Sequence, residues 1–278
     1  MVATPIGNLA DITLRAIETL HAADVIACED TRVTAKLLRA HGITTPTTSY
    51  HEHNAARAGP GLLRRLADGR TIALVSDAGT PLISDPGFKL VREAAALGIH
   101  VTAIPGASAP LMALVLSGLP SNRFFFSGFL PPKQAARRAE LKQMVAIEAT
   151  LVILESPRRL AASLADMSAV LGRRNVCVAR ELTKLHEELR RGDLADVAAH
   201  YRDAPTPKGE VVVVVGPPEE SAADSDADDV DARLAAAIQT MSVRDAAAMV
   251  AEACGVPRRT VYARALELAS SRRGAGDD

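Results

Sequence analysis

The sequence predicts an α/β protein with a parallel-sheet N-terminal domain, a mixed-sheet second domain and a helix-turn-helix-like tail. In residues 1–121, short apolar runs alternate with amphipathic segments, a pattern typical of parallel strands with helices between them. In residues 122–218, the apolar runs follow one another over shorter connections, which favours a mixed sheet. Residues 219–231 are rich in Asp, Ala and Ser and lack apolar periodicity, so we expect a linker before a helical domain at 232–278.

The first domain contains several strand-like segments, each of which ends in a turn of small or acidic residues. Strands are expected at 1–4, 24–28, 71–75 and 100–104, with helices at 14–22, 33–41, 55–67, 88–97 and 111–116. The turns that follow these strands are 5–8, 29–32, 76–81 and 105–109. Parallel strands end at a common edge of their sheet, and open α/β sheets bind ligands there. We therefore expect the turns to form a binding site together.

The segment from Thr71 to Gly87 organises this domain. It begins as a β-branched apolar run and then breaks at 77–81, where Gly79 frees the backbone and Pro81 removes a hydrogen-bond donor. A second break precedes the helix from Phe88, which we expect Asp85 or Ser84 to cap. The connection is longer than strand-to-helix packing requires, so it indicates ligand binding. The sequence contains neither a dinucleotide-binding nor a P-loop motif.

Two histidines and three cysteines raise the question of metal binding. His51 and His53 would share a face if residues 50–54 formed a strand, but no third ligand stands at matching spacing, so no metal is expected. Contact with a substrate or a solvated loop are the other readings of these histidines. The cysteines at positions 28, 177 and 254 lie in separate apolar segments and give no disulfide framework.

The second domain is expected to hold strands at 124–129, 150–154, 175–179, 186–191 and 211–215. The helix at 133–146 carries Lys133, Arg137, Arg138 and Lys142, which predict either a solvated face or a surface that contacts phosphates. The tail predicts helices at 230–240, 243–254 and 257–269 with a tight turn between the last two. Arg258, Arg259 and Arg264 on the last helix favour nucleic-acid contact, with a helical packing module as the alternative.

The overall composition restricts the class of protein only loosely. The 278 residues include 32 basic and 33 acidic side chains, a net charge of −1, which argues neither for nor against a nucleic-acid partner. No segment reaches the apolar length of a membrane span, and the N-terminus lacks the pattern of a signal peptide. A cytoplasmic protein is expected.

Seven short motifs together resemble the tetrapyrrole-methylase superfamily and, within it, the branch that methylates bacterial 16S rRNA at the ribose of a cytidine. They occur in the family's order at 3–9, 28–32, 76–87, 105–109, 128–131, 155–158 and 180–184. The resemblance covers about residues 1–217, and the tail matches an extension that many members carry. The family's first strand normally starts several residues earlier, so we expect either a misassigned start or a weakened first strand here.

This resemblance implies S-adenosylmethionine in the cleft between the two α/β domains, 2′-O-methylation of a cytidine in 16S rRNA of the small ribosomal subunit, and a homodimer. The cofactor-binding positions that it implies are Pro5, Asp77, Ala78, Gly79, Ile83, Ser108, Ala109 and Leu130, with Gly209 and Glu210 near the adenine.

The chemistry of methyl transfer to a hydroxyl adds a further expectation. A ribose 2′-hydroxyl is a poor nucleophile until it loses its proton, so a general base should lie within hydrogen-bond reach. The candidates are Glu29, Asp30, His51, Glu181 and Lys184, and positioning alone is the alternative. Two rival functions remain open at this point: methylation of a tetrapyrrole or other small molecule, and a DNA-binding regulator without enzymatic activity.

Overall fold

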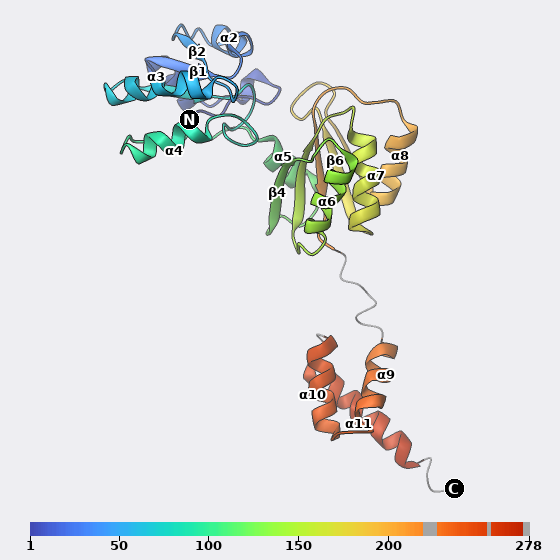
Figure 1. The fold of residues 1–278 in the computed structure, drawn as a ribbon. Helices are drawn as coiled ribbons and strands as arrows, with labels where there is room; N and C mark the ends of the chain where they lie inside the picture. Colours follow the sequence, from blue (N-terminus) through green and yellow to red (C-terminus); the bar gives the residue numbers. More distant parts are fainter. Residues whose placement is uncertain (219–226, 255–256, 275–278) are drawn as a thin grey trace. The chain divides into compact units, whose positions relative to one another are not determined.

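The computed structural model describes residues 1–218, 227–254 and 257–274 of the chain. These residues belong to two units, a main unit of residues 1–218 and a tail unit within residues 219–278. Figure 1 shows both units, and each is described here by itself. No described helix is long and apolar enough to cross a membrane.

The first sheet of the main unit is parallel, as the alternating pattern predicts. It consists of β1 (Val25–Cys28), β2 (Thr47–Ser49) and β3 (Ile72–Val75) in the order β2-β1-β3. The short helix η1 (Leu9–Asp11) and α1 (Leu14–Ala22), α2 (Thr31–Ala40), α3 (Ala55–Ala67) and α4 (Phe88–Ala96) complete this part. Thr13 caps α1 through a hydrogen bond from the Ala16 amide to its hydroxyl.

Two expected strands are wrong as strands. Residues 1–4 form two isolated bridges, one from Val2 to Ile104 in the second segment and one from Thr4 to Gly79 in the loop after β3. Residues 100–103 are exposed, so this segment has no second partner to extend the ladder.

Residues 51–54 form a turn after β2 has ended, so His51 and His53 do not share a strand face. The cap of α4 is also different from the expectation: Gly87 occupies the cap position without a side-chain bond.

The second sheet is mixed, as predicted from the shorter connections. Its strands are β4 (Phe124–Phe129), β5 (Thr150–Glu155), β6 (Asn175–Arg180), β7 (Glu188–Asp193) and β8 (Val211–Val215), in the order β4-β5-β8-β6-β7. Only β4 and β5 pair in parallel; the other pairs are antiparallel.

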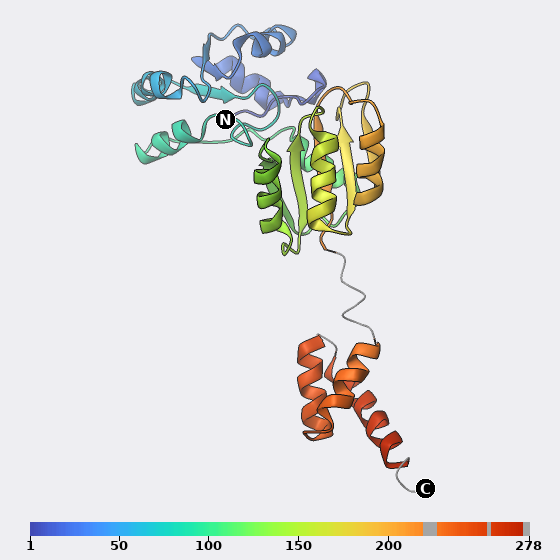
Figure 2. The ribbon, with the colours of Figure 1, turned by 45° about the vertical axis from the view of Figure 1, so that its right-hand side comes forward.

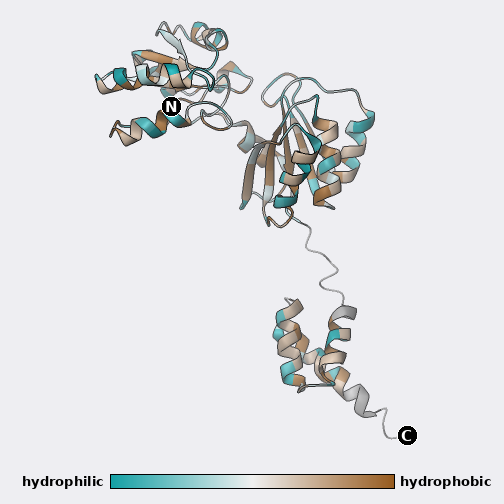
Figure 3. Ribbon diagram, in the orientation of Figure 1, coloured by the Kyte–Doolittle hydropathy of each residue, from teal (hydrophilic) through white to brown (hydrophobic). Residues whose placement is uncertain are grey.

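Helices cover both faces of this sheet. On one face, α6 (Gln134–Met144), α7 (Leu160–Leu171) and α8 (Leu194–Asp203) lie side by side (Figure 2). On the other face lies α5 (Ala109–Ser117). The central strand β8 is apolar on both sides. Val211, Val213 and Val215 pack into the core beneath α6, α7 and α8, and Val212 and Val214 pack into the core beneath α5. Figure 3 shows the hydrophobic colour of these central strands.

The basic face predicted for residues 133–146 is partly used inside the main unit. Arg137 is only 4% exposed, and its guanidinium lies 2.6 Å from the carboxylate of Asp166 on α7. Arg138 also pairs with Asp166, at 2.6 Å. These two arginines therefore hold α6 against α7, which the amphipathic pattern of α6 alone does not reveal.

The tail unit consists of three helices, α9 (Ala227–Ala237), α10 (Val243–Cys254) and α11 (Arg258–Gly274). Its core contains Leu234, Ala246, Ala247, Val250 and Val261. Helix α9 begins within the range predicted as a linker, 219–231, of which residues 219–226 lie outside the described residues, as do 255–256 of the predicted turn. The tail thus has the predicted helical class.

Candidate active site

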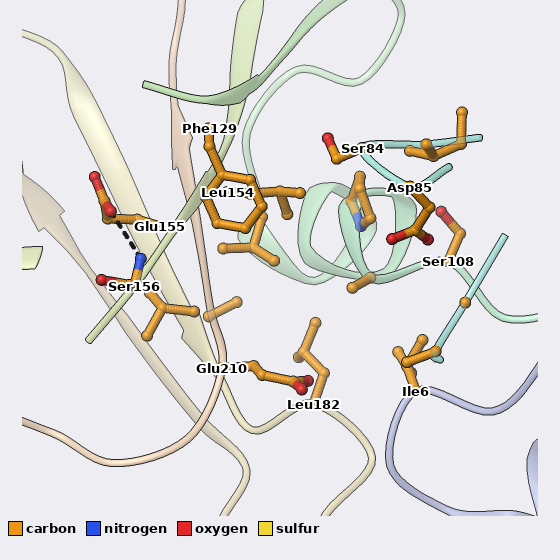
Figure 4. A pocket seen from close by; sticks show the side chains of 18 of the residues that line it. Ile6, Ser84, Asp85, Ser108, Phe129, Leu154, Glu155, Ser156, Leu182 and Glu210 are labelled. Carbon is orange, nitrogen blue, oxygen red and sulfur yellow. Dashed lines mark hydrogen bonds between the residues drawn. The ribbon is translucent and has the colours of Figure 1, made fainter. Parts of the chain in front are cut away.

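A cavity of about 340 Å³ lies in the main unit, where the loops after the first sheet face one end of the second sheet. This volume lies within the range of small-molecule sites. Its walls come from loops of both sheets and consist of Ile6, 78–80, 83–85, 108–110, Phe129, 154–157, Ala179, Leu182 and 209–212. Figure 4 shows Ser84, Asp85 and Ser108 on one side of this pocket and Glu155 and Ser156 on the other.

Backbone hydrogen bonds bring the expected turns together at this edge. The amide of Thr4 donates to the Gly79 carbonyl at 2.9 Å, and the Gly79 amide donates back to the Thr4 carbonyl at 3.0 Å. The Thr80 hydroxyl donates to the Ala107 carbonyl at 3.1 Å. Gly79 has a φ of +80°, and a Cβ there would lie 3.3 Å from Ile6. The close approach of these loops therefore needs glycine at position 79.

A second group of contacts fixes the loop on the opposite wall. Glu181 and Glu210 exchange bonds: the Glu181 amide donates to the Glu210 carbonyl at 3.0 Å, and the Glu210 amide donates to Glu181 Oε1 at 2.9 Å. Lys184 Nζ lies 2.9 Å from Glu181 and 3.2 Å from Glu210. Burial opposes the charge of Lys184, but its bonds to these two glutamates outweigh burial and raise its pKa. Lys184 is therefore a cation in this arrangement.

The side chains that line the pocket carry negative charge only. Within the described residues 1–218, Asp85, Glu155 and Glu210 line it, and no Lys, Arg or His does. Glu155 is 2% exposed and fully engaged, because it accepts bonds from the Ser156 amide at 2.7 Å, the Ser163 hydroxyl and the Arg159 guanidinium. The lining therefore favours a ligand that carries positive charge.

More carboxylates stand behind Asp85, at the ends of β1 and β3. The Asp30 amide donates to Asp77 Oδ1 at 3.0 Å. The side-chain bond from Arg32, which lies 2.6 Å from Asp30, lowers the pKa of Asp30 to about 2. Burial, followed by the charge of Asp77, raises the pKa of Glu29. Burial, together with the charges of Glu29 and Asp77 and against an interaction with the Ser76 hydroxyl, raises the pKa of Asp85 to about 6.

The structure brings most of the expected cofactor-binding residues to this pocket. Its lining includes Ala78, Gly79, Ile83, Ser108, Ala109, Gly209 and Glu210. Pro5 and Asp77 are chain neighbours of lining residues without lining the cavity themselves, and Leu130 is buried in the core of the second sheet at 1% exposure. For these three positions, binding stays a prediction.

The expected general bases lie outside the pocket lining. Glu29 and Asp30 belong to the carboxylates behind Asp85, and Glu181 and Lys184 to the ion pair behind Gly209 and Glu210. Their catalytic roles stay predictions. The sequence pointed to Asp85 only as one of two carboxylates in the 71–87 connection and as a helix cap, and it assigned Glu155 no site role. Both line the pocket, and the local signal for Glu155 is its place at the end of a buried strand.

Comparison with known proteins places these features in a family. Residues 1–198 match the family model of Tetrapyrrole (Corrin/Porphyrin) Methylases, and residues 224–269 match the RsmI C-terminal HTH domain. The chain is 54% identical to Ribosomal RNA small subunit methyltransferase I of Mesorhizobium japonicum, covering 100% of this chain and 94% of the relative. It is 46% identical to the protein of the same name from Escherichia coli O157:H7, and the match covers 96% of this chain and 94% of the relative.

Solved structures with low sequence identity share the fold. Diphthine synthase aligns with a TM-score of 0.61 at 17% identity, covering 77% of this chain and 88% of that chain. Uroporphyrin-III-C-methyltransferase from Thermus thermophilus aligns with a TM-score of 0.54 at 19% identity, covering 77% and 92%. At this identity the likeness concerns the fold alone.

Proposed function

We propose, because this chain belongs to the tetrapyrrole methylase family, that it transfers the methyl group of S-adenosylmethionine to the 2′-oxygen of a cytidine ribose in 16S rRNA of the small ribosomal subunit. The names of its relatives support small-subunit rRNA as the substrate, and the match of its tail to the RsmI C-terminal HTH domain supports the same branch of the family. Both matches favour rRNA over a tetrapyrrole as the methyl acceptor.

The acidic lining of the pocket is the observation that supports S-adenosylmethionine as the cofactor. S-Adenosylmethionine supplies an activated methyl group on a positively charged sulfur, and it also carries a protonated amine. A cavity lined by three carboxylates and no cationic side chain within residues 1–218 suits such a ligand. The same lining opposes a phosphate-bearing cofactor, which cationic side chains and helix N-termini normally bind.

The lining also suits the uncharged part of this ligand. The apolar side chains of Ile6, Ile83, Leu154, Leu182 and Val212 offer contacts for an adenine ring. We propose that the cofactor is held by Ala78, Gly79, Ile83, Ser108, Ala109, Gly209 and Glu210, with Pro5, Asp77 and Leu130 as further expected contacts.

The protein's main contribution to the rate would be positioning. A displacement at carbon requires the attacking oxygen to stand in line with the leaving sulfur, and holding both partners in place supplies much of the acceleration. Gly79 and Gly209 allow the backbone to approach the ligand closely, because each adopts a positive φ without a side chain. A base among Glu29, Asp30, Glu181 and Lys184 remains part of this proposal.

We also propose that the protein acts as a homodimer. Helix α5 exposes Val115 at 63% and Leu111 at 45%, and strand β4 exposes Phe129 at 57% and Phe124 at 45%. Such exposed apolar side chains favour a protein–protein contact. Light scattering after size exclusion should give twice the chain mass for the wild type and a smaller mass for Leu111→Glu with Val115→Glu. A monomeric wild type would contradict the dimer.

Because ribosomal subunits are its substrate in this proposal, the enzyme would act in the cytoplasm.

Transfer of labelled methyl groups tests the proposed function directly. Purified protein is incubated with labelled S-adenosylmethionine and small ribosomal subunits from a strain that lacks the corresponding gene, and the RNA is digested to nucleosides. We expect label in 2′-O-methylcytidine. Label in the base, or label in a tetrapyrrole but not in RNA, would contradict the proposal.

A further inference from the structure

We propose that Asp85 is the general base of this reaction and takes the proton of the ribose 2′-hydroxyl. The inference rests on the proposed function, because it assigns the proton of that reaction. In the step, the ribose oxygen forms a bond to the methyl carbon, the electron pair of the broken carbon–sulfur bond stays on sulfur, and the hydroxyl proton moves to a carboxylate oxygen of Asp85. No further reactant is needed for this balance.

The first argument is the state of the carboxylates that line the pocket. The carboxylate of Glu155 accepts hydrogen bonds from Ser156, Ser163 and Arg159, and the residue is 2% exposed, so its oxygens are already occupied. Glu210 pairs with Lys184. Asp85 forms no ion pair with any described residue and lies on the pocket wall beside Ser84 and Ser108 (Figure 4). Asp85 interacts with the Ser76 hydroxyl but, unlike Glu155 and Glu210, it has no cationic partner among residues 1–218, so its carboxylate can accept a proton.

The second argument is the surroundings of Asp85, which make its carboxylate basic. It is partly buried, and the negative charges that face it come from Glu29 at the end of β1 and Asp77 at the end of β3. Burial first, and then the charges of Glu29 and Asp77, raise the pKa of Asp85 to about 6 against the hydrogen bond from Ser76. A base with a pKa just below neutral is ionised at pH 7 and still accepts a proton effectively.

The bases expected from the sequence are less suited to this task, and one of them, His51, does not line the pocket. Lys184 is held as a cation by Glu181 and Glu210. Asp30, paired with Arg32, has a pKa of about 2 and is a weak base. The bond from Lys184 lowers the pKa of Glu181. Glu29 does not line the pocket, and its place behind Asp85 gives it a positioning role through its charge.

The decisive variant is Asp85→Asn, which keeps the shape of the side chain and removes the base. We expect single-turnover methyl transfer to small subunits to fall about 10²–10⁴-fold, as for loss of a general base. Calorimetry should still detect S-adenosylmethionine, bound more weakly because one of the three lining carboxylates is lost, and this binding reports folding. Transfer is therefore measured at saturating cofactor, so that its fall reports the loss of the base and not of the cofactor. Asp68→Asn, at an exposed position after α3, is the matched control and should transfer methyl groups at the wild-type rate.

A second variant separates the roles of Asp85 and Glu29. Glu29→Gln removes one of the charges that raise the pKa of Asp85, so a carbon-13 titration of the Asp85 carboxyl should shift to lower pH. The acidic limb of the pH–rate profile, expected near the pKa of about 6, should move the same way.

The outcomes distinguish this inference from the function on which it rests. If the Asp85→Asn variant transfers methyl groups at the wild-type rate, the role of Asp85 is overturned and the proposed function stays intact. Loss of transfer in Glu29→Gln, with only a shifted limb in Asp85→Asn, would assign the base to Glu29 instead. A wild-type protein that binds S-adenosylmethionine but does not methylate rRNA would overturn the proposed function, and the role of Asp85 with it.

Discussion

Gly209 lies in the loop that forms one wall of the pocket, at a φ of +92°, and a Cβ at this position would come within 2.1 Å of the Glu181 side chain. Gly209→Ala should therefore lose about 1–2 kcal/mol of unfolding free energy from the backbone alone and more from displacement of Glu181. Gly98→Ala is the matched control, because Gly98 has a φ of +72° with open space around it. Urea unfolding checks this, and equal losses in both variants would contradict the contact.

Single residues were predictable where the backbone limits the choice of side chain. Gly79 stands in a turn whose composition already indicated an unusual backbone, and Gly209 was expected near the cofactor from the family resemblance; both line the pocket with a positive φ. The role of Asp85 was not predictable in the same way, because its basicity depends on Glu29, which is distant in the chain. The local sequence predicts instead that Asp85 caps the following helix, but Gly87 occupies the cap position of α4.

At the scale of elements, the buried Asp166 joins α6 to α7. Its side chain is 0% exposed and accepts bonds from Gln134, Arg137 and Arg138. Asp166→Ala leaves the charge of the buried Arg137 without its carboxylate, with only the Pro132 carbonyl still accepting a bond from it, so we expect a loss of about 3–5 kcal/mol of unfolding free energy. Asp203→Ala, which removes an exposed pair with Arg202, should change stability little. Equal effects of the two variants in urea unfolding would contradict this expectation.

The pH dependence of this link has a defined sign. Burial alone would raise the pKa of Asp166, but the bonds from Arg138, Arg137 and Gln134 outweigh it and lower the pKa. A carboxyl with a depressed folded pKa contributes stability above its unfolded pKa, about 4, and loses it as the pH falls through the folded value. The stability difference between wild type and Asp166→Asn should therefore shrink below about pH 4.

Elements with a full set of neighbours followed the sequence pattern, and those without did not. Helix α3 and strand β8 have the predicted bounds, because Leu62 and the valines of β8 are buried as their periodicity requires. The segment 100–104 has strand composition, but only Ile104 forms a bridge. Whether a strand forms depends on its partner, which local composition does not contain.

At the scale of the whole molecule, cofactor and RNA binding should be separable. The pocket lies entirely within residues 1–218, whereas Arg258 and Arg259 stand exposed in the first turn of α11. We expect Arg258→Ala with Arg259→Ala to weaken binding to small ribosomal subunits and to reduce its salt dependence by about 1–2 in logarithmic slope. The affinity for S-adenosylmethionine should stay unchanged.

Arg264→Ala is the control for this prediction. Arg264 lies 2.6 Å from Asp231 and from Glu267, so its charge is engaged within the tail. Its loss should affect the stability of the tail more than the salt slope of RNA binding. Equal reductions of the slope by both variants, measured at several salt concentrations, would count against the assignment of Arg258 and Arg259.

The architecture as a whole was accessible from the sequence. Connection length distinguished the parallel sheet from the mixed one, and the loss of apolar periodicity after residue 218 marked the change to the tail. How α6 attaches was not accessible, because the arginines that suggested a solvated or phosphate-binding face pair with Asp166 on another helix.

The acidic lining of the pocket has a consequence for turnover and inhibition. In the proposed reaction the ligand enters with a positive sulfur and leaves with a neutral one, so the three carboxylates attract the donor more strongly than the spent product. Product release would be assisted by this loss of charge. An inhibitor that keeps a permanent cation in place of the sulfur should remain in the pocket, whereas an uncharged thioether should be exchanged quickly.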